Sequence, residues 1–293
     1  MIYLSSILNV YSKPFKAFSV LKAVQKVFNI GIVLSLGLPG LAWAQVNISG
    51  KPGLIYIPSA EVVADGTFSF GYGFNPSSYA FRFSPQANPL VTTRNSESIA
   101  FVNLVVFPRL EVNINLLLPN GPIQYSAKGI GDRQIDIKYA LLTEKAKRPS
   151  VAVIISAPFG IDNSLITNVV VATKHVNISK SITTAFTLGM SSPYSLYRAE
   201  VKNDKDSDIF SGYTLKDKRD KPNYYLAGPF GGVNLNVNKK GGFMVEWDSQ
   251  HVNVGAYALL FKHWTVQAGL LNGDQVTAST SYAIPLLRKP KRP

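Results

Sequence analysis

The sequence of 293 residues contains no cysteine. Disulfide bonds and thiolate metal sites are therefore excluded. Charged residues are also scarce, at 16% of the chain, where typical soluble domains have roughly 25%. A chain with so little charge departs from the composition of an ordinary soluble enzyme.

The signatures of common catalytic and metal sites are missing as well. The three histidines, His175, His251 and His263, lie far apart and lack the paired spacing of a metal site. Neither a G-x-S-x-G nucleophile elbow nor a phosphate-binding loop occurs. We therefore expect no enzymatic activity, no metal ion and no cofactor. A barrel enzyme acting on lipid or polysaccharide is the less favoured alternative.

The net charge is +13, and a basic chain suggests nucleic acid, anionic lipid or an acidic polymer as a partner. No stretch interleaves arginine with aromatic residues as a nucleic-acid platform would. We expect no nucleic-acid partner.

Residues 1–44 have the features of a secretory signal peptide. They contain Lys13, Lys16, Lys22 and Lys26 but no acidic residue, and an apolar run follows at 27–38. That run is too short to cross a bilayer core of ~30 Å as a helix. Small residues occupy the positions that signal peptidase reads, so we predict cleavage between Ala44 and Gln45.

Beyond the signal peptide, the hydrophobic period is two, as in half-buried antiparallel strands. Leu110–Leu118 and Gln134–Leu142 alternate apolar and polar residues most clearly. Many segments approach the ~9–11 residues of a tilted membrane-spanning strand. We predict an all-β transmembrane barrel of about twelve antiparallel strands at 67–75, 97–107, 110–118, 133–142, 150–157, 166–175, 181–190, 230–237, 242–248, 253–261, 264–272 and 275–284.

The connections between these strands alternate in length. Bacterial barrels combine short periplasmic turns with longer outer loops and an even strand number, which places both termini in the periplasm. The longest connection, Ser191–Pro229, is highly charged. It is either a solvated surface loop or a ligand-binding or gating loop folded over the pore.

The barrel is expected to span residues 67–284, with a short plug-like or periplasmic segment at 45–66 and a basic tail at 285–293. Pro52, Gly53 and Pro58 make that segment irregular. Charged residues on the polar faces are candidates for lining the lumen. They are Glu111, Arg133, Asp136, Lys138, Glu246 and Asp248.

Three segments, in order, resemble one family. Gly50–Gly66, GKPGLIYIPSAEVVADG, resembles the opening element of the YjbH-type exopolysaccharide proteins. The strand from Gly131 is similar to the family's "D-R-x-x-D-hydrophobic-K" element, which Asp132, Arg133, Asp136 and Lys138 match. Gly242–Gly269 is similar to an acidic-aromatic-acidic strand and the strands after it.

This resemblance implies a protein of the Gram-negative outer membrane that acts in exopolysaccharide production or export, as a conduit or as an accessory scaffold. It implies outer-membrane lipid, an extracellular polysaccharide and periplasmic secretion components as partners, and carries over no catalytic residue. Two alternatives remain, a general small-solute porin and a soluble periplasmic β protein. Wide aqueous channels need ~16–18 strands, so twelve suggest a lumen largely filled by side chains and the N-terminal segment.

Overall fold

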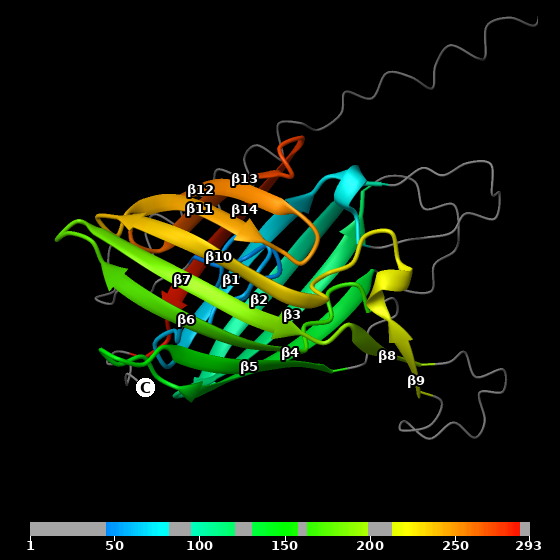
Figure 1. Cartoon of the computed structure of the whole chain (residues 1–293), viewed down its shortest axis with the longest axis horizontal. Helices are drawn as coiled ribbons and strands as arrows, with labels where there is room; N and C mark the ends of the chain where they lie inside the picture. Colours follow the sequence, from blue (N-terminus) through cyan, green and yellow to red (C-terminus); the bar gives the residue numbers. More distant parts are fainter. Residues whose placement is uncertain (1–44, 82–94, 121–130, 158–162, 199–212, 288–293) are drawn as a thin grey trace, which may run out of the picture. The chain divides into compact units, whose positions relative to one another are not determined.

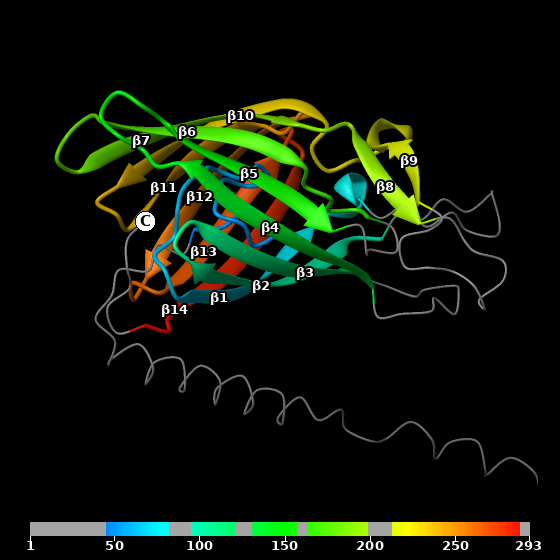
Figure 2. The same cartoon turned by 90° about the horizontal axis from the view of Figure 1, so that it is seen from below.

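The computed structural model describes residues 45–81, 95–120, 131–157, 163–198 and 213–287. Antiparallel strands close into a twelve-stranded barrel, because β1 pairs with both β2 and β14 (Figures 1 and 2). The predicted all-β barrel and its strand number are confirmed. Its strands are β1 (Thr67–Asn75), β2 (Glu97–Phe107), β3 (Leu110–Pro119), β4 (Asp132–Leu142), β5 (Ser150–Ala157), β6 (Val169–Asn177), β7 (Ile182–Ser191), β10 (Gly228–Val237), β11 (Gly241–Trp247), β12 (Val252–Leu260), β13 (Trp264–Leu271) and β14 (Gln275–Pro285).

The connections divide the barrel into two distinct ends. Segments 108–109, 143–149, 178–181, 238–240 and 261–263 form what we call the short-turn end. The other connections meet at the long-loop end. At the β10–β11 turn, Asn238 and Lys239 have φ values of 53° and 58°, as a type I′ hairpin requires. The first residue of β1 and the last residue of β14 pair at the short-turn end.

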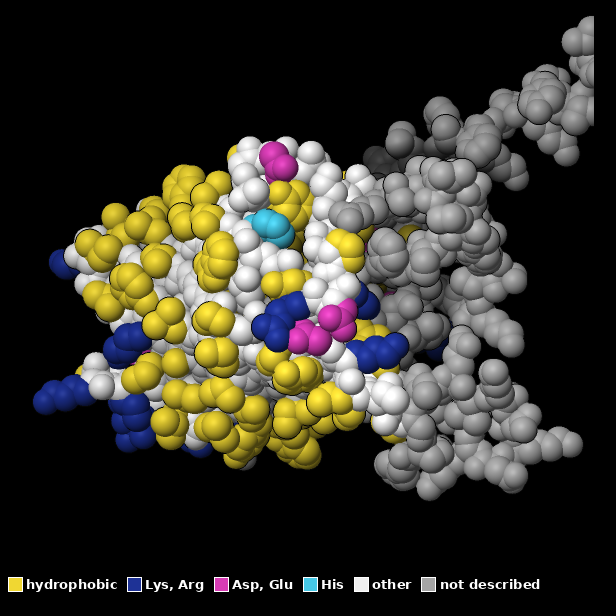
Figure 3. Space-filling model, turned by 45° about the vertical axis from the view of Figure 1, so that its right-hand side comes forward, with side chains coloured by type: hydrophobic (Ala, Val, Ile, Leu, Met, Phe, Trp, Pro, Cys, Tyr) yellow, Lys and Arg dark blue, Asp and Glu magenta, His cyan; other side chains and the backbone are white. Residues whose placement is uncertain are grey.

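The outward face of the barrel is apolar. On β4, Ile135, Ile137 and Tyr139 are exposed while the residues between them are buried. On β7, Phe186, Leu188 and Met190 show the same alternation. Hydrophobic side chains accordingly cover much of the barrel surface in Figure 3. A soluble barrel would place its apolar faces inward, whereas a barrel in lipid places them outward.

The structure departs from the expected strands and loops in several places. Strand β6 begins at Val169 instead of residue 166, and the long connection contains a hairpin of β8 (Tyr194–Arg198) and β9 (Tyr213–Asp217). Short 3-10 helices occur at η1 (Ser77–Tyr79) and η2 (Lys218–Asp220). No helix of the described residues is long and apolar enough to cross a membrane.

Residues 45–66 lie inside the barrel, and we call them the plug. Isolated bridges join Val46 to Pro52 and Gly53 to Pro58, and the backbone N–H of Ile48 donates to the carbonyl of Ile55. Almost all of residues 46–60 are buried. The barrel wall accommodates the plug by having glycine where the two approach closely. A Cβ atom at position 269, where the chain has Gly269, would lie only 3.1 Å from Cγ2 of Ile55.

The predicted signal peptide, with Ala44, lies outside the described residues, as does most of the predicted tail, residues 288–293. Gln45 is described and half-buried. Its amide nitrogen donates to the carbonyl of Gly53 at 2.8 Å, and its amide oxygen accepts from Asn234 at 2.8 Å. The described chain therefore starts within the barrel.

Candidate functional site

The barrel interior contains a buried ion pair between the plug and the wall. The Lys51 ammonium lies 2.6 Å from the Asp136 carboxylate, and each side chain is only 1% exposed. The second partner of Lys51 is the Ser49 hydroxyl, at 2.8 Å. Asp136 also accepts hydrogen bonds from Ser156 and Asn115. Because unpaired charges are costly to bury, this pair fixes the plug against β4.

A second pair lies on neighbouring strands. Lys138 of β4 lies 3.2 Å from Glu111 of β3, and both are buried. Lys138 also donates to the backbone carbonyl of Glu61, the residue at which the plug turns toward β1. Lys138 is thus paired with the wall and with the plug backbone, whereas the second oxygen of Glu111, Oε2, has no hydrogen-bond partner among the described residues.

Glu246 of β11 binds the plug through its backbone. Its carboxylate accepts hydrogen bonds from the backbone N–H groups of Ile55, Tyr56 and Ile57, at 2.8 to 3.3 Å. Hydrogen bonds from successive backbone N–H groups to a carboxylate stabilise its charge. Asn253 of β12 donates to the same carboxylate at 3.1 Å.

Asp248 follows β11 and is buried at the long-loop end. It accepts hydrogen bonds from the backbone N–H groups of Gln250 and His251 and from the Asn253 amide. These contacts hold the tight β11–β12 connection. Asp248 is therefore bound within its own loop.

Arg133 does not line the lumen, and its assignment is corrected. Asp132, Gln134, Asp136 and Lys138 are buried on β4, whereas Arg133 is exposed on the opposite face. Successive side chains of a strand point to opposite faces, so Arg133 shares the outward face with Ile135. Its place near the long-loop end lets a long side chain reach a polar boundary.

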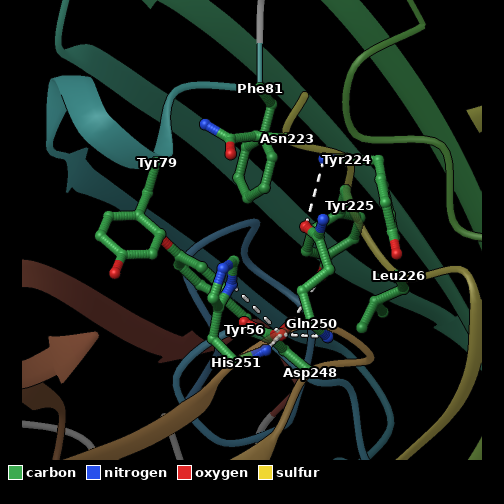
Figure 4. Close-up of a pocket in the computed structure, with 10 residues that line it drawn as sticks. All are labelled: Tyr56, Tyr79, Phe81, Asn223, Tyr224, Tyr225, Leu226, Asp248, Gln250 and His251. Carbon is green, nitrogen blue, oxygen red and sulfur yellow. Dashed lines mark hydrogen bonds and ion pairs between the residues drawn. The ribbon is translucent and has the colours of Figure 1, made fainter. Parts of the chain in front are cut away.

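Aromatic residues lie together at the long-loop end, and we call Tyr56, Tyr79, Phe81, Tyr224 and Tyr225 the aromatic cap (Figure 4). Phe81 makes edge contacts with Tyr56 of the plug and with Tyr225, each at 5.5 Å between ring centroids. Asn223 donates to the carbonyls of Ser78 and Ala80, which joins two connections. The recess that remains between these residues has a volume of about 10 Å³, which is about the space of one water.

Lys218 lies beneath this cap and is buried. Its ammonium donates to the carbonyls of Leu226, at 2.8 Å, and Ile166, at 3.1 Å. Burial lowers the pKa of Lys218 to about 7, because desolvation outweighs the attraction of Asp136 and Asp217. Lys218 itself is thus packed into the barrel mouth, whereas its neighbours Arg219 and Asp220 are exposed.

A cavity of about 670 Å³ opens on the other side of the plug, toward the short-turn end. We call it the vestibule. Its volume falls within the ~300–1,000 Å³ typical of ligand sites. The amides of Gln45, Asn177, Asn234 and Asn236 line it, with the hydroxyls of Thr183, Tyr257 and Thr265. Within the described chain, the buried oxygens Asn234 Oδ1 and Thr265 Oγ1 have no hydrogen-bond partner.

A histidine bridges plug and wall at the vestibule. Nε2 of His175 lies 2.9 Å from a carboxylate oxygen of Glu61, and Nδ1 lies 2.6 Å from one of Glu144. Lys174 pairs with Glu144 at 2.9 Å. The cluster joins the exit of the plug, β6 and the β4–β5 connection.

Sequence reasoning missed Lys51, Lys218, Tyr225 and the cluster around His175. Lys51 is the one charged residue in segment 45–60, which indicates a buried partner, but nothing in the sequence identifies Asp136 as that partner. Within the described residues, no group of three or more His, Cys, Asp or Glu could hold a metal ion.

Comparison with known proteins adds one finding. A family model, YjbH, described as "Exopolysaccharide biosynthesis protein YbjH", matches residues 45–292. No curated protein matches the chain. The match covers the plug and every strand of the barrel, and the segments that resemble this family lie within it.

Proposed function

Because the chain belongs to the YjbH family of exopolysaccharide biosynthesis proteins, we propose that it acts in the outer membrane of a Gram-negative cell. Its role there is accessory, as a scaffold for polysaccharide production or export. It performs no catalytic step. Its partners are outer-membrane lipid, the polysaccharide and periplasmic secretion components, and nucleic acid is not one of them.

The outward apolar face supports the membrane location. A barrel in the outer membrane presents apolar side chains to lipid and places its short turns in the periplasm. On this proposal the short-turn end and the vestibule face the periplasm, and the aromatic cap faces the cell exterior. The signal peptide expected at residues 1–44 would deliver the chain to this location.

The observation that carries the accessory role is the filled lumen. The plug occupies the barrel interior and is held by Lys51–Asp136 and by three backbone hydrogen bonds to Glu246. A recess among the residues of the aromatic cap has room for about one water. A polymer could pass only if the plug left its position.

The first test asks whether the protein acts in polymer production at all. The gene is deleted in the source bacterium, and secreted polysaccharide is measured with and without a restored copy. We expect polymer to fall on deletion and to recover with the wild-type gene. Unchanged polymer would refute the proposed function. Heat-modifiability of the protein in outer-membrane fractions tests the location.

A second test separates scaffold from conduit by locking the plug. The chain has no natural cysteine, so Ile55→Cys with Gly269→Cys introduces a single possible disulfide. Cγ2 of Ile55 lies 3.1 Å from a Cβ at position 269, which brings the two Cβ atoms near the ~3.5–4.5 Å of a disulfide. Each single variant is the control.

An accessory scaffold should support polymer production equally in the oxidised and reduced forms of the double variant. Loss of export on oxidation, restored by a reductant, would show that the plug must move and would favour a conduit. The same variant in planar bilayers tests the porin alternative. We expect the wild type to show no steady conductance, whereas a porin would conduct without any polysaccharide partner.

A further inference from the structure

Basic residues surround the barrel mouth at the short-turn end. Each of the five connections at this end contains lysine or arginine. Figure 3 shows dark blue side chains gathered at the end of the barrel that lies away from the long loops. We call these residues the basic rim, and they are Arg109, Lys145, Lys147, Arg148, Lys180, Lys239, Lys240 and Lys262.

Acidic residues do not balance the basic rim. Glu144 is the one acidic residue in these five connections, all of which lie in the described part of the chain. Its carboxylate is already paired with Lys174 and His175. The long-loop end differs, because its main connection, residues 192–227, carries both signs in similar numbers. The positive field is therefore concentrated at one mouth.

The vestibule behind the rim offers the groups that bind a sugar. Asn234 and Asn236 of β10 and Thr183 of β7 provide amide and hydroxyl groups, and Tyr257 of β12 adds a phenol. Neutral donors and acceptors of this kind suit the hydroxyl groups of a saccharide. Two carboxylates, Glu61 and Glu144, also line the cavity, and each is paired with His175.

From this juxtaposition we propose that the vestibule and the basic rim together bind a segment of an anionic saccharide, one with carboxylate or phosphate groups. The neutral amides and hydroxyls bind sugar hydroxyls inside the cavity. The lysines of the rim attract the acidic groups of the units that remain outside. The inference rests on the proposed function and specifies its ligand class, which is an acidic polysaccharide approaching from the periplasm.

Binding to the purified, detergent-solubilised protein tests the site. The probes are a galacturonate oligomer and a neutral malto-oligosaccharide of equal length, measured by titration calorimetry. We expect the acidic probe to bind at least tenfold more tightly than the neutral one. Its affinity should fall several-fold between low salt and about 0.3 M salt, because counterions screen the attraction of the exposed lysines.

Charge-reversal variants test the rim. Lys240→Glu with Lys262→Glu changes two exposed rim residues outside the vestibule lining and should weaken the acidic probe at least tenfold, with little effect on the neutral one. Lys216→Glu with Lys221→Glu makes the same change in net charge at the long-loop end and should leave both affinities unchanged. Equal loss in both double variants would refute a localised site.

A cavity-filling variant tests the vestibule. Ala185 is buried and lines the cavity, so Ala185→Trp should reduce the affinity for both probes at least tenfold. Ala256 lies on the exposed face of β12, and Ala256→Trp is the matched control. Heat-modifiability on a gel confirms that each variant folds. Full binding by a folded Ala185→Trp variant would overturn the proposal.

Other outcomes are equally decisive. Equal affinity for the acidic and neutral probes would show that the rim has no role in recognition. Binding to vesicles containing phosphatidylglycerol, with none to either saccharide, would show that the rim contacts lipid headgroups instead. If gene deletion abolishes the polymer but neither probe binds, the proposed function stands and this inference fails. If the acidic probe binds but deletion leaves the polymer unchanged, the site stands and the proposed function fails.

Discussion

Removing either member of the Lys51–Asp136 pair should destabilise the barrel, and by different amounts. Both side chains are 1% exposed and their charged atoms lie 2.6 Å apart. Breaking a buried pair from one side typically costs ~3–5 kcal/mol. After Lys51→Met, Asp136 retains Ser156 and Asn115 as donors, so we expect a loss of about 3 kcal/mol, the lower limit. After Asp136→Leu, Lys51 retains the hydrogen bond to Ser49 and a contact with the ring of Tyr225 but no opposite charge, so we expect about 5 kcal/mol.

The assay is urea unfolding of the refolded protein in detergent, followed by the change in gel mobility between unboiled and boiled samples. The double variant, Lys51→Met with Asp136→Leu, should lose less stability than the sum of the single changes, because neither charge is then buried alone. Arg133→Met is the control on the same strand. Arg133 is exposed, and such surface substitutions usually change stability by less than ~0.5 kcal/mol.

Two results would refute this reasoning. If Lys51→Met cost no more than Arg133→Met, the pair would not hold the plug. If the double variant lost the full sum of the two single losses, the residues would act independently, and their contact would contribute nothing measurable.

Three further predictions follow from the same interior. Glu246→Gln removes a charge that accepts three backbone hydrogen bonds and should cost about 1.5–3 kcal/mol in the same unfolding assay. Gly269→Val places carbon atoms against Ile55 and Thr277 and should cost about 1–3 kcal/mol, whereas Ala268→Val on the exposed face should not. In the folded protein the pKa of Lys218 is lowered to about 7, whereas in the unfolded chain it has its ordinary value of 10.5. Between these two pH values the unfolded chain therefore binds one more proton than the folded protein does. The free energy of unfolding should therefore rise with pH across that window, and a Lys218→Met variant should lack this part of the rise. If the free energy of unfolding had the same slope against pH in both proteins, the lowered pKa of Lys218 would be contradicted.

The barrel could be predicted because the alternation of apolar and polar residues is visible within each single strand. Polar Glu111, Asn113 and Asn115 alternate with apolar residues on β3, and all three are buried inward. The strand number followed from the alternating segments themselves, and the alternation of short and long connections distinguished the two ends of the barrel. Arg133 was wrongly predicted to line the lumen because its charge was considered without its position on the strand. A shift of one residue along a strand moves a side chain to the opposite face.

The contacts of the plug could not be predicted, because they join segments remote in sequence. Glu246 is recognised by backbone N–H groups of residues 55–57, which carry no sequence signature. The β8–β9 hairpin was missed for a related reason. Its strands are five residues each and are separated by a long charged stretch, so neither length nor alternation distinguished them from a loop.

The interior charges and the vestibule have different roles. Asp136, Lys138, Glu111 and Glu246 are already bonded to one another or to the plug, so a ligand could reach them only by breaking those contacts. The vestibule instead is an open cavity lined by amides and hydroxyls, beside a mouth ringed by lysines and arginines. Substitutions in the first group should therefore change stability, and substitutions in the second should change binding. A vestibule variant that unfolds the barrel without altering ligand affinity would contradict this division.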